Sequence, residues 1–495
     1  MEHLLTTSEM AAADRLTIEA GLSGAMLMSR AGRAVAQCVQ SMIKPGGTVL
    51  VVCGPGNNGG DGFVVARTLF DRGYTVRLVL AGKIENLRGD ALSAALAWQG
   101  SLLQPAQATL DEVDVIVDGL FGAGLSREIS GELRILVERL NAFGKPIIAI
   151  DIPSGISGDT GQVRGVAVRA HRTVTFFRRK PGHLLYPGKS CCGSVSVADI
   201  GIDGDVLETI NPKIGINSPD FWPDVLVPPT EEGHKFSRGH AVVVSGGIES
   251  TGAARLAAHA ALRAGAGLVT VASPTDSLAV NAAALSDIMV RRSDGLEGLT
   301  TLLEDPRRNA VIIGPGNGVG KMTRDRVKAV LGMKRSAVLD ADALTSFEAH
   351  LDELREALVP EHQELVVATP HEGEFARLFR SQPDILTLDH RLGRARAAAE
   401  LLGIVIVLKG PDTIIAAPDG RALINANGTP WLATAGSGDV LAGIIGGLLA
   451  RGIAAFSAAA AGVWLHAEAG REVGPGLAAR DLADGLKIVL GRSVG

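Results

Sequence analysis

The segment Thr48–Gly62 reads TVLVVCGPGNNGGDG, an apolar run followed at once by a glycine-rich loop. The run is typical of a buried strand, and the helical spacing of residues 62–72 predicts a helix after the loop. Because such runs recur with helical patterns between them, the chain predicts βαβ units and a mainly parallel sheet. Further strands are expected at 75–80, 113–117 and 146–150, and further helices at 131–143 and within the segment 7–40.

Composition and charge narrow the class of protein. The chain has 495 residues, of which 46% are hydrophobic and 4% aromatic, and it contains 62 Gly. This length predicts roughly two or three domains, and this apolar fraction excludes a disordered or fibrous chain. The formal net charge of −5 lacks the basic footprint of nucleic-acid-binding domains, so we expect no nucleic-acid partner. The short basic cluster at 178–180 is interpreted as a solvated loop, with binding of an anionic small ligand as the alternative.

The cysteines and the apolar segments bear on cellular location. No CxxC pair occurs among the four cysteines, so we expect reduced thiols and a cytoplasmic protein. The first residues lack the basic and apolar pattern of a signal peptide. The most apolar stretch, 440–464, contains Arg451 and many small residues, which predicts packed core helices rather than a membrane span.

The alternation of strands and helices breaks between 211 and 229, where five prolines and no clear period predict a linker. The alternation resumes after it. We therefore expect two α/β domains, an N-terminal one over 1–218 and a C-terminal one over 224–495. The strands of the second domain are expected at 241–245, 268–272, 310–314, 337–339, 365–368 and 404–409.

The glycine loop at 54–62 admits several interpretations. Its glycines match GxGxxG, but the next strand does not end in the acidic residue that binds a ribose in dinucleotide sites. A Walker loop fails as well, because His183 stands where the first glycine before 188–190 should be. A turn that caps the next helix is the structural alternative. Two more strand ends carry polar glycine-rich loops, at 118–125 and 151–155, and such ends meet at one crevice, which favours a ligand site.

These loops resemble a known family. GPGNNGGDG, DGLFGAGL, DIPSG, the later TVTF and Lys180 are similar to the N-terminal epimerase domain of the NAD(P)H-hydrate repair proteins, over residues 1–215. That domain interconverts the R and S forms of NADHX and NADPHX, the hydrated forms of NADH and NADPH. The resemblance implies a Rossmann-like three-layer αβα domain with a K⁺ site at Asn58, Asp118 and Ser154. It also implies substrate contacts from Asn57, Asn58, Gly59, Gly60, Asp61, Gly122, Ala123, Gly124, Leu125, Ser126, Arg127, Glu128 and Asp151.

Asp151 is the candidate for the group that moves a proton, because epimerisation inverts a carbon that bears a hydroxyl. The implied K⁺ ligands suit a hard cation, which prefers amide, carboxylate and hydroxyl oxygens to sulfur. Ala123 departs from the threonine that is common between the two glycines in this family. The departure removes a hydroxyl contact but leaves the backbone amides in place.

The second half has its own glycine loop, ATAGSGDVLAG at 433–443, before an apolar helix. Backbone amides at a helix start stabilise an anion, and Asp439 on the first turn is placed to take a proton from a hydroxyl beside it. Stabilisation of the helix dipole is the alternative role for Asp439. Asp340 and Asp342 are interpreted as turn-capping residues in preference to Mg²⁺ ligands. Polar loops also follow the expected strands that end near Gly314, Leu339, Ala368 and Leu408.

The motifs of the second half resemble the ribokinase-like fold, and most closely the nucleotide-dependent NAD(P)HX dehydratases. The resemblance runs from about Glu231 to the end and includes DADAL, TPHEGE, KGPDT and AGSGDVLAG. It implies a ribokinase-like αβα domain in which Ala253, Gly316, His371 and Asp439 face the hydrate. Ser437 and Asn317 replace the commoner Thr and Leu without removing a required group. The nucleotide contacts that the resemblance implies are Lys409, Gly410, Pro411, Asp412, Thr413 and Gly438, with the region 425–428.

Together the resemblances imply an epimerase (an isomerase) fused to a dehydratase (a lyase). The second domain would use ADP or ATP, with ADP favoured and Mg²⁺ expected, to dehydrate the S epimer to NADH or NADPH. Asp439 would deprotonate the hydroxyl, and the amides of 436–438 would stabilise developing charge. We expect small-molecule substrates, no membrane partner and a homo-oligomer. Two alternatives stay open: a vitamin or sugar kinase with an N-terminal ligand-binding domain, and an N-terminal interaction scaffold similar to that of some mRNA-decapping proteins.

Overall fold

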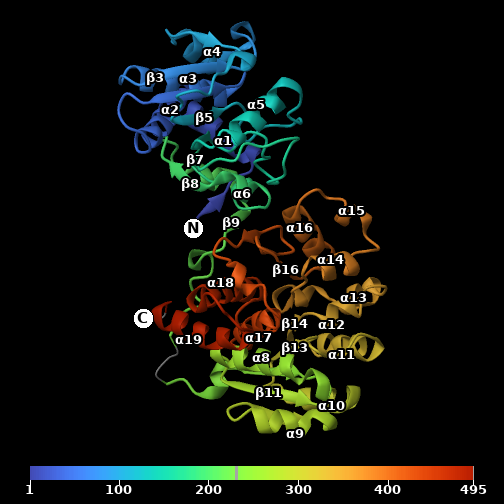
Figure 1. Ribbon diagram of the computed structural model, residues 1–495. Helices are drawn as coiled ribbons and strands as arrows, with labels where there is room; N and C mark the ends of the chain where they lie inside the picture. Colours follow the sequence, from blue (N-terminus) through green and yellow to red (C-terminus); the bar gives the residue numbers. More distant parts are fainter. Residues whose placement is uncertain (229–231, 494–495) are drawn as a thin grey trace. The chain divides into compact units, whose positions relative to one another are not determined.

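The computed structural model describes residues 1–228 and 232–493 (Figure 1). The chain forms two compact units. One unit is His3–Ile214, and the other holds Met1–Glu2 together with the chain from Gly215 onward. Each unit is built around its own sheet.

A parallel sheet of order β4-β3-β2-β5-β6-β7-β8 forms the centre of the N-terminal unit. Its strands are β2 (Thr48–Cys53), β3 (Thr75–Leu80), β4 (Leu102–Leu103), β5 (Val115–Gly119), β6 (Ile147–Ile150), β7 (Arg172–Phe176) and β8 (Ser194–Ala198), and a short β1 (His3–Leu4) precedes them. The helices are α1 (Thr7–Glu19), α2 (Gly24–Gln40), α3 (Asn57–Phe70), α4 (Gly89–Leu96), α5 (Gly131–Ala142), α6 (Gly188–Cys192) and α7 (Val206–Ile210). The parallel sheet confirms the predicted βαβ organisation.

Helices cover both faces of this sheet, as the residues of β2 show. Val51 and Cys53 pack in one core with side chains of α2 and α3, whereas Leu50 and Val52 pack in a second core with α5. All four side chains are fully buried. Because successive strand residues point to opposite faces, this alternation requires a layer of helices on each side. The unit therefore has the expected three layers.

The order of the strands reverses at the centre of this sheet. From β2 the chain moves outward to β3 and β4, and it then returns to place β5 on the other side of β2. In open α/β sheets a ligand crevice forms at the carboxyl ends of the strands where the order reverses. Here the loops after β2 and β5 lie at that point.

The C-terminal unit contains a larger sheet of order β18-β17-β16-β15-β14-β13-β10-β11-β12, parallel except for the pairs β16–β17 and β17–β18. Its strands are β10 (His240–Val244), β11 (Leu268–Ser273), β12 (Met289–Arg292), β13 (Ala310–Ile313), β14 (Ser336–Leu339), β15 (Val366–Ala368), β16 (Val405–Leu408), β17 (Ile414–Ala416) and β18 (Ala422–Ile424). Its helices are α8 (Thr251–Arg263), α9 (Thr275–Ala284), α10 (Gly295–Leu303), α11 (Lys321–Gly332), α12 (Asp342–Thr345), α13 (Leu351–Ala357), α14 (Glu372–Leu378), α15 (Pro383–Leu386), α16 (Arg391–Leu402), α17 (Ser437–Ala450), α18 (Ala455–Val473) and α19 (Leu482–Ser493).

The apolar stretch 440–464 forms most of α17 and the first half of α18, and the side chains of both helices are largely buried. Small residues let α17 approach α8 closely. A Cβ added at Gly443 would lie 2.2 Å from the carbonyl oxygen of Ala257, and one added at Gly447 would lie 2.4 Å from that of Ala261. The prediction of packed core helices is confirmed. Among the described residues, no helix is both long and apolar enough to cross a membrane.

The structure corrects the predicted linker at 211–229. Within it, β9 (Ile214–Ile216) is a strand, and Trp222 and Val225 are buried in the core of the C-terminal unit. The side-chain amide of Asn217 donates to the carbonyl oxygen of Ala460 at 2.8 Å. Prolines break the periodicity of this segment without making it a free connection. Pro229 and Glu231 lie outside the described residues.

The helical prediction for 7–40 is confirmed by two helices, α1 and α2, which are separated by a turn at Gly21, where φ is +107°. Two other predictions need correction. Helix α3 begins at Asn57 rather than at Gly62, so the polar part of the glycine loop forms the first turn. The solvated-loop interpretation of 178–180 is wrong for Lys180, which is 1% exposed.

Candidate functional site

A cavity of about 580 Å³ opens in the N-terminal unit at the reversal of strand order. Its walls come from α1, α2, the loops after β2 and β5, and the end of β6. It brings together a large part of the predicted substrate site: Asn57, Asn58, Asp61, Gly122, Ala123, Gly124, Leu125, Ser126, Arg127 and Asp151. The remaining predicted contacts, Gly59, Gly60 and Glu128, are not among the lining residues.

The glycines of the first loop hold the two ligand loops together. A Cβ on Gly54 would lie 1.7 Å from the carbonyl oxygen of Leu120, in the loop after β5. A Cβ on Gly59 would lie 1.9 Å from the carbonyl oxygen of Gly54, and one on Gly60 would meet the sulfur of Met28 at 2.8 Å. A side chain at Gly54 would push the two loops apart, and one at Gly59 or Gly60 would displace the loop backbone or the helices packed against it. Gly59 and Gly60 therefore shape the site from behind its surface.

Asp151 follows β6 with φ of +63°, a conformation that non-glycine residues seldom adopt. Its carboxylate accepts hydrogen bonds from Lys180 Nζ at 2.5 Å and from Thr175 Oγ1 at 2.9 Å. Burial alone would raise the pKa of Asp151, but the Lys180 charge and these hydrogen bonds hold that pKa below its ordinary value. The side chain is therefore a carboxylate near neutral pH.

His183 supports Asp151 from the other side. Its Nε2 donates to the carbonyl oxygen of Asp151 at 2.8 Å, and its Nδ1 accepts from the backbone N–H of Lys180 at 2.9 Å. Burial and the nearby Lys180 charge lower the pKa of His183 to about 4, so the ring is neutral. Sequence reasoning missed His183 and Thr175. Their signal was the TVTF segment and the Lys-Pro-Gly-His run, whose roles show only in three dimensions.

The predicted K⁺ ligands lie around the loop after β5. Asp118 is fully buried and accepts hydrogen bonds from the backbone N–H of Ser154 at 2.8 Å and from its Oγ at 2.6 Å. Burial raises the pKa of Asp118 to about 6, against the opposing effect of the Ser154 hydrogen bonds. The Asn58 side chain approaches this loop from α3, since a Cβ on Gly122 would lie 3.2 Å from Asn58 Oδ1. The backbone N–H of Phe121 donates to Ser154 Oγ at 2.8 Å, so the same loop joins the cluster to the cavity.

Two more carboxyl groups line the cavity, and both resist ionisation. Burial raises the pKa of Asp14, on α1, to about 6, with a smaller contribution from the Asp151 charge. Burial raises the pKa of Asp61 well above its ordinary value, helped by the charges of Asp151 and Asp14. Sequence reasoning named Asp61 but missed Asp14. The available signal was an acidic residue four positions after Met10, on the apolar face of a helix.

In the C-terminal unit, Asp439 lies on the first turn of α17, as predicted. Burial raises the pKa of Asp439 to about 6, and the Asp340 charge adds to the effect. Lys409 at the end of β16 lies nearby but pairs with Asp340, at 2.6 Å, and with Glu374, at 3.7 Å. Burial alone would lower the pKa of Lys409, but these carboxylates raise it above its ordinary value.

The start of α17 is arranged around Lys409. A Cβ on Gly438 would lie 3.6 Å from Lys409 Nζ, so the first backbone amides of the helix and a lysine charge face the same space. Gly436 has φ of +85°, which begins the helix sharply beside Asp439. Ser437 Oγ and His466 Nε2 lie 3.0 Å apart, and burial lowers the pKa of His466 to about 4. A neutral histidine therefore fixes the hydroxyl of Ser437.

The loop TPHEGE places His371 at the N-cap of α14. Its Nδ1 accepts hydrogen bonds from the backbone N–H groups of Gly373 at 2.9 Å and Glu374 at 3.3 Å. The Glu374 carboxylate in turn accepts from the backbone N–H of His371 at 2.8 Å. Nε2 of the half-exposed ring lies 3.4 Å from Glu374 Oε1, so both ring nitrogens are held at the start of α14.

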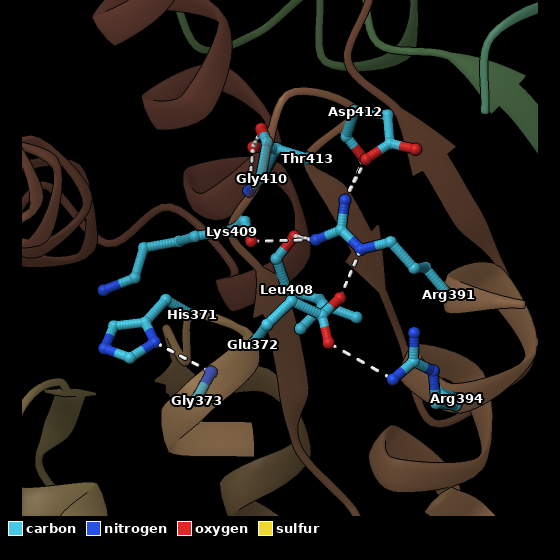
Figure 2. A network of polar contacts seen from close by, with 10 residues as sticks. All are labelled: His371, Glu372, Gly373, Arg391, Arg394, Leu408, Lys409, Gly410, Asp412 and Thr413. Atoms are coloured by element: carbon cyan, nitrogen blue, oxygen red, sulfur yellow. Dashed lines mark hydrogen bonds and ion pairs between the residues drawn. The ribbon is translucent and has the colours of Figure 1, made fainter. Parts of the chain in front are cut away.

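Figure 2 shows how Arg391, at the start of α16, ties the predicted nucleotide loop to the His371 loop. Its guanidinium pairs with Asp412 and with Glu372, and it donates to the carbonyl oxygen of Lys409 at 2.8 Å. Within the loop, Thr413 Oγ1 accepts from the backbone N–H of Gly410 at 3.1 Å (Figure 2). Sequence reasoning missed Arg391, because nothing in its surroundings marks it as different from other surface arginines.

The predicted hydrate contacts Ala253 and Gly316 come together, since a Cβ on Gly316 would lie 3.6 Å from the Cβ of Ala253. A second cavity of about 580 Å³ lies beside them and is lined by Gly246, Asp276 and Asn317, among others. Asn317 itself is structural. Its side chain accepts from the backbone N–H of Gly314 and donates to the carbonyl oxygen of Val244, both at 2.8 Å.

The two aspartates of DADAL have different roles. Asp340 is 1% exposed and pairs with Lys409, so it is an ion-pair partner rather than a turn cap. Asp342 Oδ2 accepts from the backbone N–H of Gly318 at 2.8 Å, which ties two loops together. Across residues 1–228 and 232–493, no group of three or more His, Cys, Asp or Glu side chains is arranged to hold a metal ion.

Comparisons with known proteins divide the chain in the same way. Residues 24–182 match the family described as YjeF-related protein N-terminus, and residues 241–486 match NAD(P)H-hydrate dehydratase. A solved ADP/ATP-dependent NAD(P)H-hydrate dehydratase from Bacillus subtilis, co-crystallised with ATP/Mg²⁺, is 30% identical, with a TM-score of 0.49. The similarity to that structure covers 56% of this chain and 98% of the other.

Full-length relatives connect the two halves. A bifunctional NAD(P)H-hydrate repair enzyme of Moorella thermoacetica is 36% identical over 99% of this chain and 96% of its own length. One of Coxiella burnetii is 35% identical over 96% of this chain and 97% of its own length. The chain therefore belongs to the family of bifunctional NAD(P)H-hydrate repair enzymes.

Proposed function

We propose that the N-terminal unit interconverts the R and S epimers of NADHX and NADPHX, and that the C-terminal unit dehydrates the S epimer to NADH or NADPH. The observation that carries this proposal is the similarity over nearly the whole chain to relatives named bifunctional NAD(P)H-hydrate repair enzymes. The vitamin or sugar kinase alternative explains only the C-terminal unit. A catalytically inactive interaction scaffold would not explain why the N-terminal unit has a buried Lys180–Asp151 ion pair at a cavity.

In the epimerase unit, Asp151 is the proton-accepting group of the proposal. Its carboxylate lines the cavity, and the Lys180 ammonium keeps it ionised where burial alone would neutralise it. The second oxygen of that carboxylate is left for the substrate, because Lys180 and Thr175 both bind Oδ1. Asn57, Asp61 and the amides of residues 122–128 would hold the rest of the hydrate.

A K⁺ ion in the epimerase unit fits the donor set at Asn58, Asp118 and Ser154. Amide, carboxylate and hydroxyl oxygens are the ligands that a hard cation prefers, and Asn58 Oδ1, the Asp118 carboxylate and Ser154 Oγ supply these three oxygen types beside the same loop. Bound there, the ion would supply positive charge for the anionic oxygens of the substrate. The side chains of Asp118 and Ser154 bond to each other and to the loop 120–121.

In the dehydratase unit, Asp439 would take the proton from the hydroxyl of the hydrate as that oxygen attacks a phosphoryl group. Phosphorylation turns a poor leaving group into a good one, and elimination then restores the nicotinamide ring. The amides at 436–438 and the Lys409 ammonium would stabilise the charge that develops. Ala253, Gly316 and His371 would contact the hydrate.

The co-substrate of the dehydratase would be ADP or ATP, held by the loop Lys409–Thr413 with Gly438 and the region 425–428. Arg391 holds this loop through Asp412 and through the carbonyl oxygen of Lys409 (Figure 2). Mg²⁺ would reach the site with the nucleotide, because the described residues offer no preformed cluster of metal-binding side chains. The four free cysteines agree with the proposed cytoplasmic location, and sedimentation would test the proposed homo-oligomer.

The near-ultraviolet absorbance of the dihydronicotinamide ring tests both activities in one sample. We would give the protein an R/S mixture of NADHX, first with ADP and then with ATP. Full recovery of NADH with one nucleotide establishes both activities and identifies that nucleotide. Recovery that stops at the S fraction would leave only the dehydratase. No recovery with either nucleotide, together with a stable phosphorylated product from a small alcohol, would favour the kinase alternative.

A further inference from the structure

Helix α1 presents one face to the N-terminal cavity, and Asp14 is the only charged residue on that face. The face consists of Thr7, Met10, Ala11, Asp14 and Ile18, which repeat at helical spacing. The helix is anchored at its start, where Thr7 donates to Asp159 through its backbone N–H and its hydroxyl, both at 2.7 Å. A carboxyl group is therefore held in a fixed position on an otherwise largely apolar wall.

The charged groups around Asp14 come from every side of the cavity: Asp61 on α3, Asp90 on α4, Arg127 after β5, and Asp151 with Lys180. Across residues 1–228 and 232–493, the Asp14 carboxyl group forms no hydrogen bond or ion pair. Its environment is opposite to that of Asp151, which is bound by a lysine and a threonine. Burial raises the pKa of Asp14 to about 6, whereas the pKa of Asp151 lies below its ordinary value.

The chemistry of the hydrate calls for two groups of this kind. Water adds to the enamine of the reduced nicotinamide so that the hydroxyl lies on the carbon bonded to the ring nitrogen. The nitrogen lone pair is able to expel that hydroxyl if an acid protonates it, and the other epimer forms if a base deprotonates a water that adds from the opposite face. One cavity must therefore hold an acid and a base at the same time.

Resting on the epimerase function proposed above, we infer that Asp14 is a second catalytic residue, the acid that protonates the departing hydroxyl, while Asp151 is the base. The C–O bond breaks, its electron pair leaves with oxygen as water, and the nitrogen lone pair forms the C=N bond. A solvent water then adds to the other face of the carbon, the C=N electrons return to nitrogen, and the proton of that water passes to Asp151. The reverse reaction exchanges the two roles, and solvent restores the protons.

Asp61 is the competing acid, and its environment argues against that role. It is more strongly held in the neutral form than Asp14, through burial and the charges of both Asp151 and Asp14. A proton-transfer group works best when its pKa lies near the operating pH, so a group held well above its ordinary value is a weaker acid and a better hydrogen-bond donor. Asp61 is the last residue of the NNGGD turn, which is proposed to hold the substrate, whereas Asp14 comes from a separate helix.

The test uses the full-length protein and purified R epimer, with S-epimer dehydration as an internal control for the C-terminal unit. Asp14→Asn should lower kcat for epimerisation by about 10²–10⁴-fold and leave KM within a few fold. Glu19→Gln, a carboxylate-to-amide change at an exposed position of the same helix, is the matched control and should behave as wild type. Asp14→Glu should recover part of the rate.

The pH profile of kcat/KM separates a catalytic role from a structural one. Because Asp14 acts in its protonated form, the wild-type rate should fall as pH rises through about 6, and this limb should vanish in Asp14→Asn. Asp61→Asn should keep the limb and raise KM. In water enriched in a heavy oxygen isotope, each inversion should introduce one solvent oxygen into the hydrate.

The outcomes are distinct. A wild-type protein that does not epimerise contradicts the proposed function itself. A wild type that epimerises, beside an Asp14→Asn variant with unchanged kcat and an unchanged alkaline limb, overturns the role of Asp14. Loss of the limb in Asp61→Asn alone would move the acid to Asp61, and inversion without incorporation of solvent oxygen would overturn the hydroxyl-exchange step.

Discussion

The two units each hold an aspartate with a lysine nearby, yet the pairs are connected differently. In the N-terminal unit, Lys180 Nζ bonds directly to Asp151 at 2.5 Å, and the pKa of Asp151 lies below its ordinary value. In the C-terminal unit, Lys409 bonds to Asp340 at 2.6 Å instead, and the pKa of Asp439 is raised to about 6 by burial and by the Asp340 charge. The partner that a buried lysine selects therefore decides which carboxylate stays ionised.

This difference has a consequence for pH dependence. Asp439 works as a base in its ionised form, so dehydration should weaken as pH falls through about 6. Asp151 has its pKa below its ordinary value, so its basic form persists to lower pH. As pH falls, protonation of Asp439 should therefore slow dehydration before protonation of Asp151 slows epimerisation.

The largest expected effect is that of Asp439→Asn. Removal of the general base from the start of α17 should lower S-epimer dehydration by about 10³-fold, within the range for such groups. Conversion of the R to the S epimer should continue at the wild-type rate in the same sample, because Asp439 lies in the other unit. The recovery of NADH from pure S epimer measures the first effect, and chromatography of the two epimers measures the second.

Asp484→Asn, at an exposed aspartate of α19, is the control for Asp439→Asn and should leave both rates unchanged. Dehydration within tenfold of wild type in Asp439→Asn would contradict the role of Asp439 as the base and leave the stabilisation of the helix dipole as its function.

Lys180→Met should have the next largest effect. It leaves the buried carboxylate of Asp151 without its cation, which costs about 3–5 kcal/mol for a broken buried pair. The pKa of Asp151 should rise, so epimerisation should fall by about 10²-fold near neutral pH and recover in part as pH increases. Thermal unfolding followed with epimerisation rates across pH measures both changes.

Lys189→Met, a change at a neighbouring lysine that does not line the cavity, should have little effect on epimerisation. If Lys180→Met lowered the unfolding temperature but left the epimerisation profile unmoved, Lys180 would be a structural residue only.

The fold followed from the sequence where the pattern was regular. Runs such as Thr48–Cys53 and Thr75–Leu80 became strands with the predicted bounds, since buried parallel strands are continuous apolar segments. The pattern did not resolve β17 and β18, which are three residues each, or the packing of Trp222, which depends on a partner core far away in sequence. Tertiary contacts determine the structure of such short or proline-rich segments, and the local sequence pattern does not show those contacts.

The residues of the two sites also differ in how well the sequence predicts them. Loops with unusual composition, such as 57–61 and 436–439, stand out in the amino-acid sequence by themselves. Residues such as Asp14 and Arg391 do not, because they are ordinary in sequence and differ from other aspartates and arginines only in their burial and in the groups that face them. The spacing of residues along the sequence does not show which charged side chains on separate strands and helices will pair.

A change at Asp340 should make the environment of Asp439 more similar to that of Asp151, which is paired directly with a lysine. Asp340→Asn removes the charge that helps raise the pKa of Asp439 and frees Lys409 to interact with Asp439. The pKa of Asp439 should fall, so the acid limb of the dehydration profile should move below about 6, with a rate loss of about 10-fold at neutral pH because the base is weaker. Thr369→Val, which removes an uncharged contact of Asp340 at 2.8 Å, should leave the limb in place. An unmoved limb in Asp340→Asn would show that burial alone sets the pKa.

Arg391→Lys should have the smallest effect, because it changes the support of the nucleotide loop and no group proposed to move a proton. A lysine has no planar fork, so it cannot bind Asp412, Glu372 and the carbonyl oxygen of Lys409 together (Figure 2). The loop should be held less firmly, and KM for the nucleotide should rise by about 3–10-fold, equivalent to about 1 kcal/mol, with kcat within about twofold. Arg394→Lys, at the neighbouring arginine that pairs with Glu372 at 3.2 Å, is the matched control and should leave KM unchanged. An equal rise of KM in both variants would assign the effect to Glu372, whereas a fall in kcat alone would place Arg391 in the chemistry of the site.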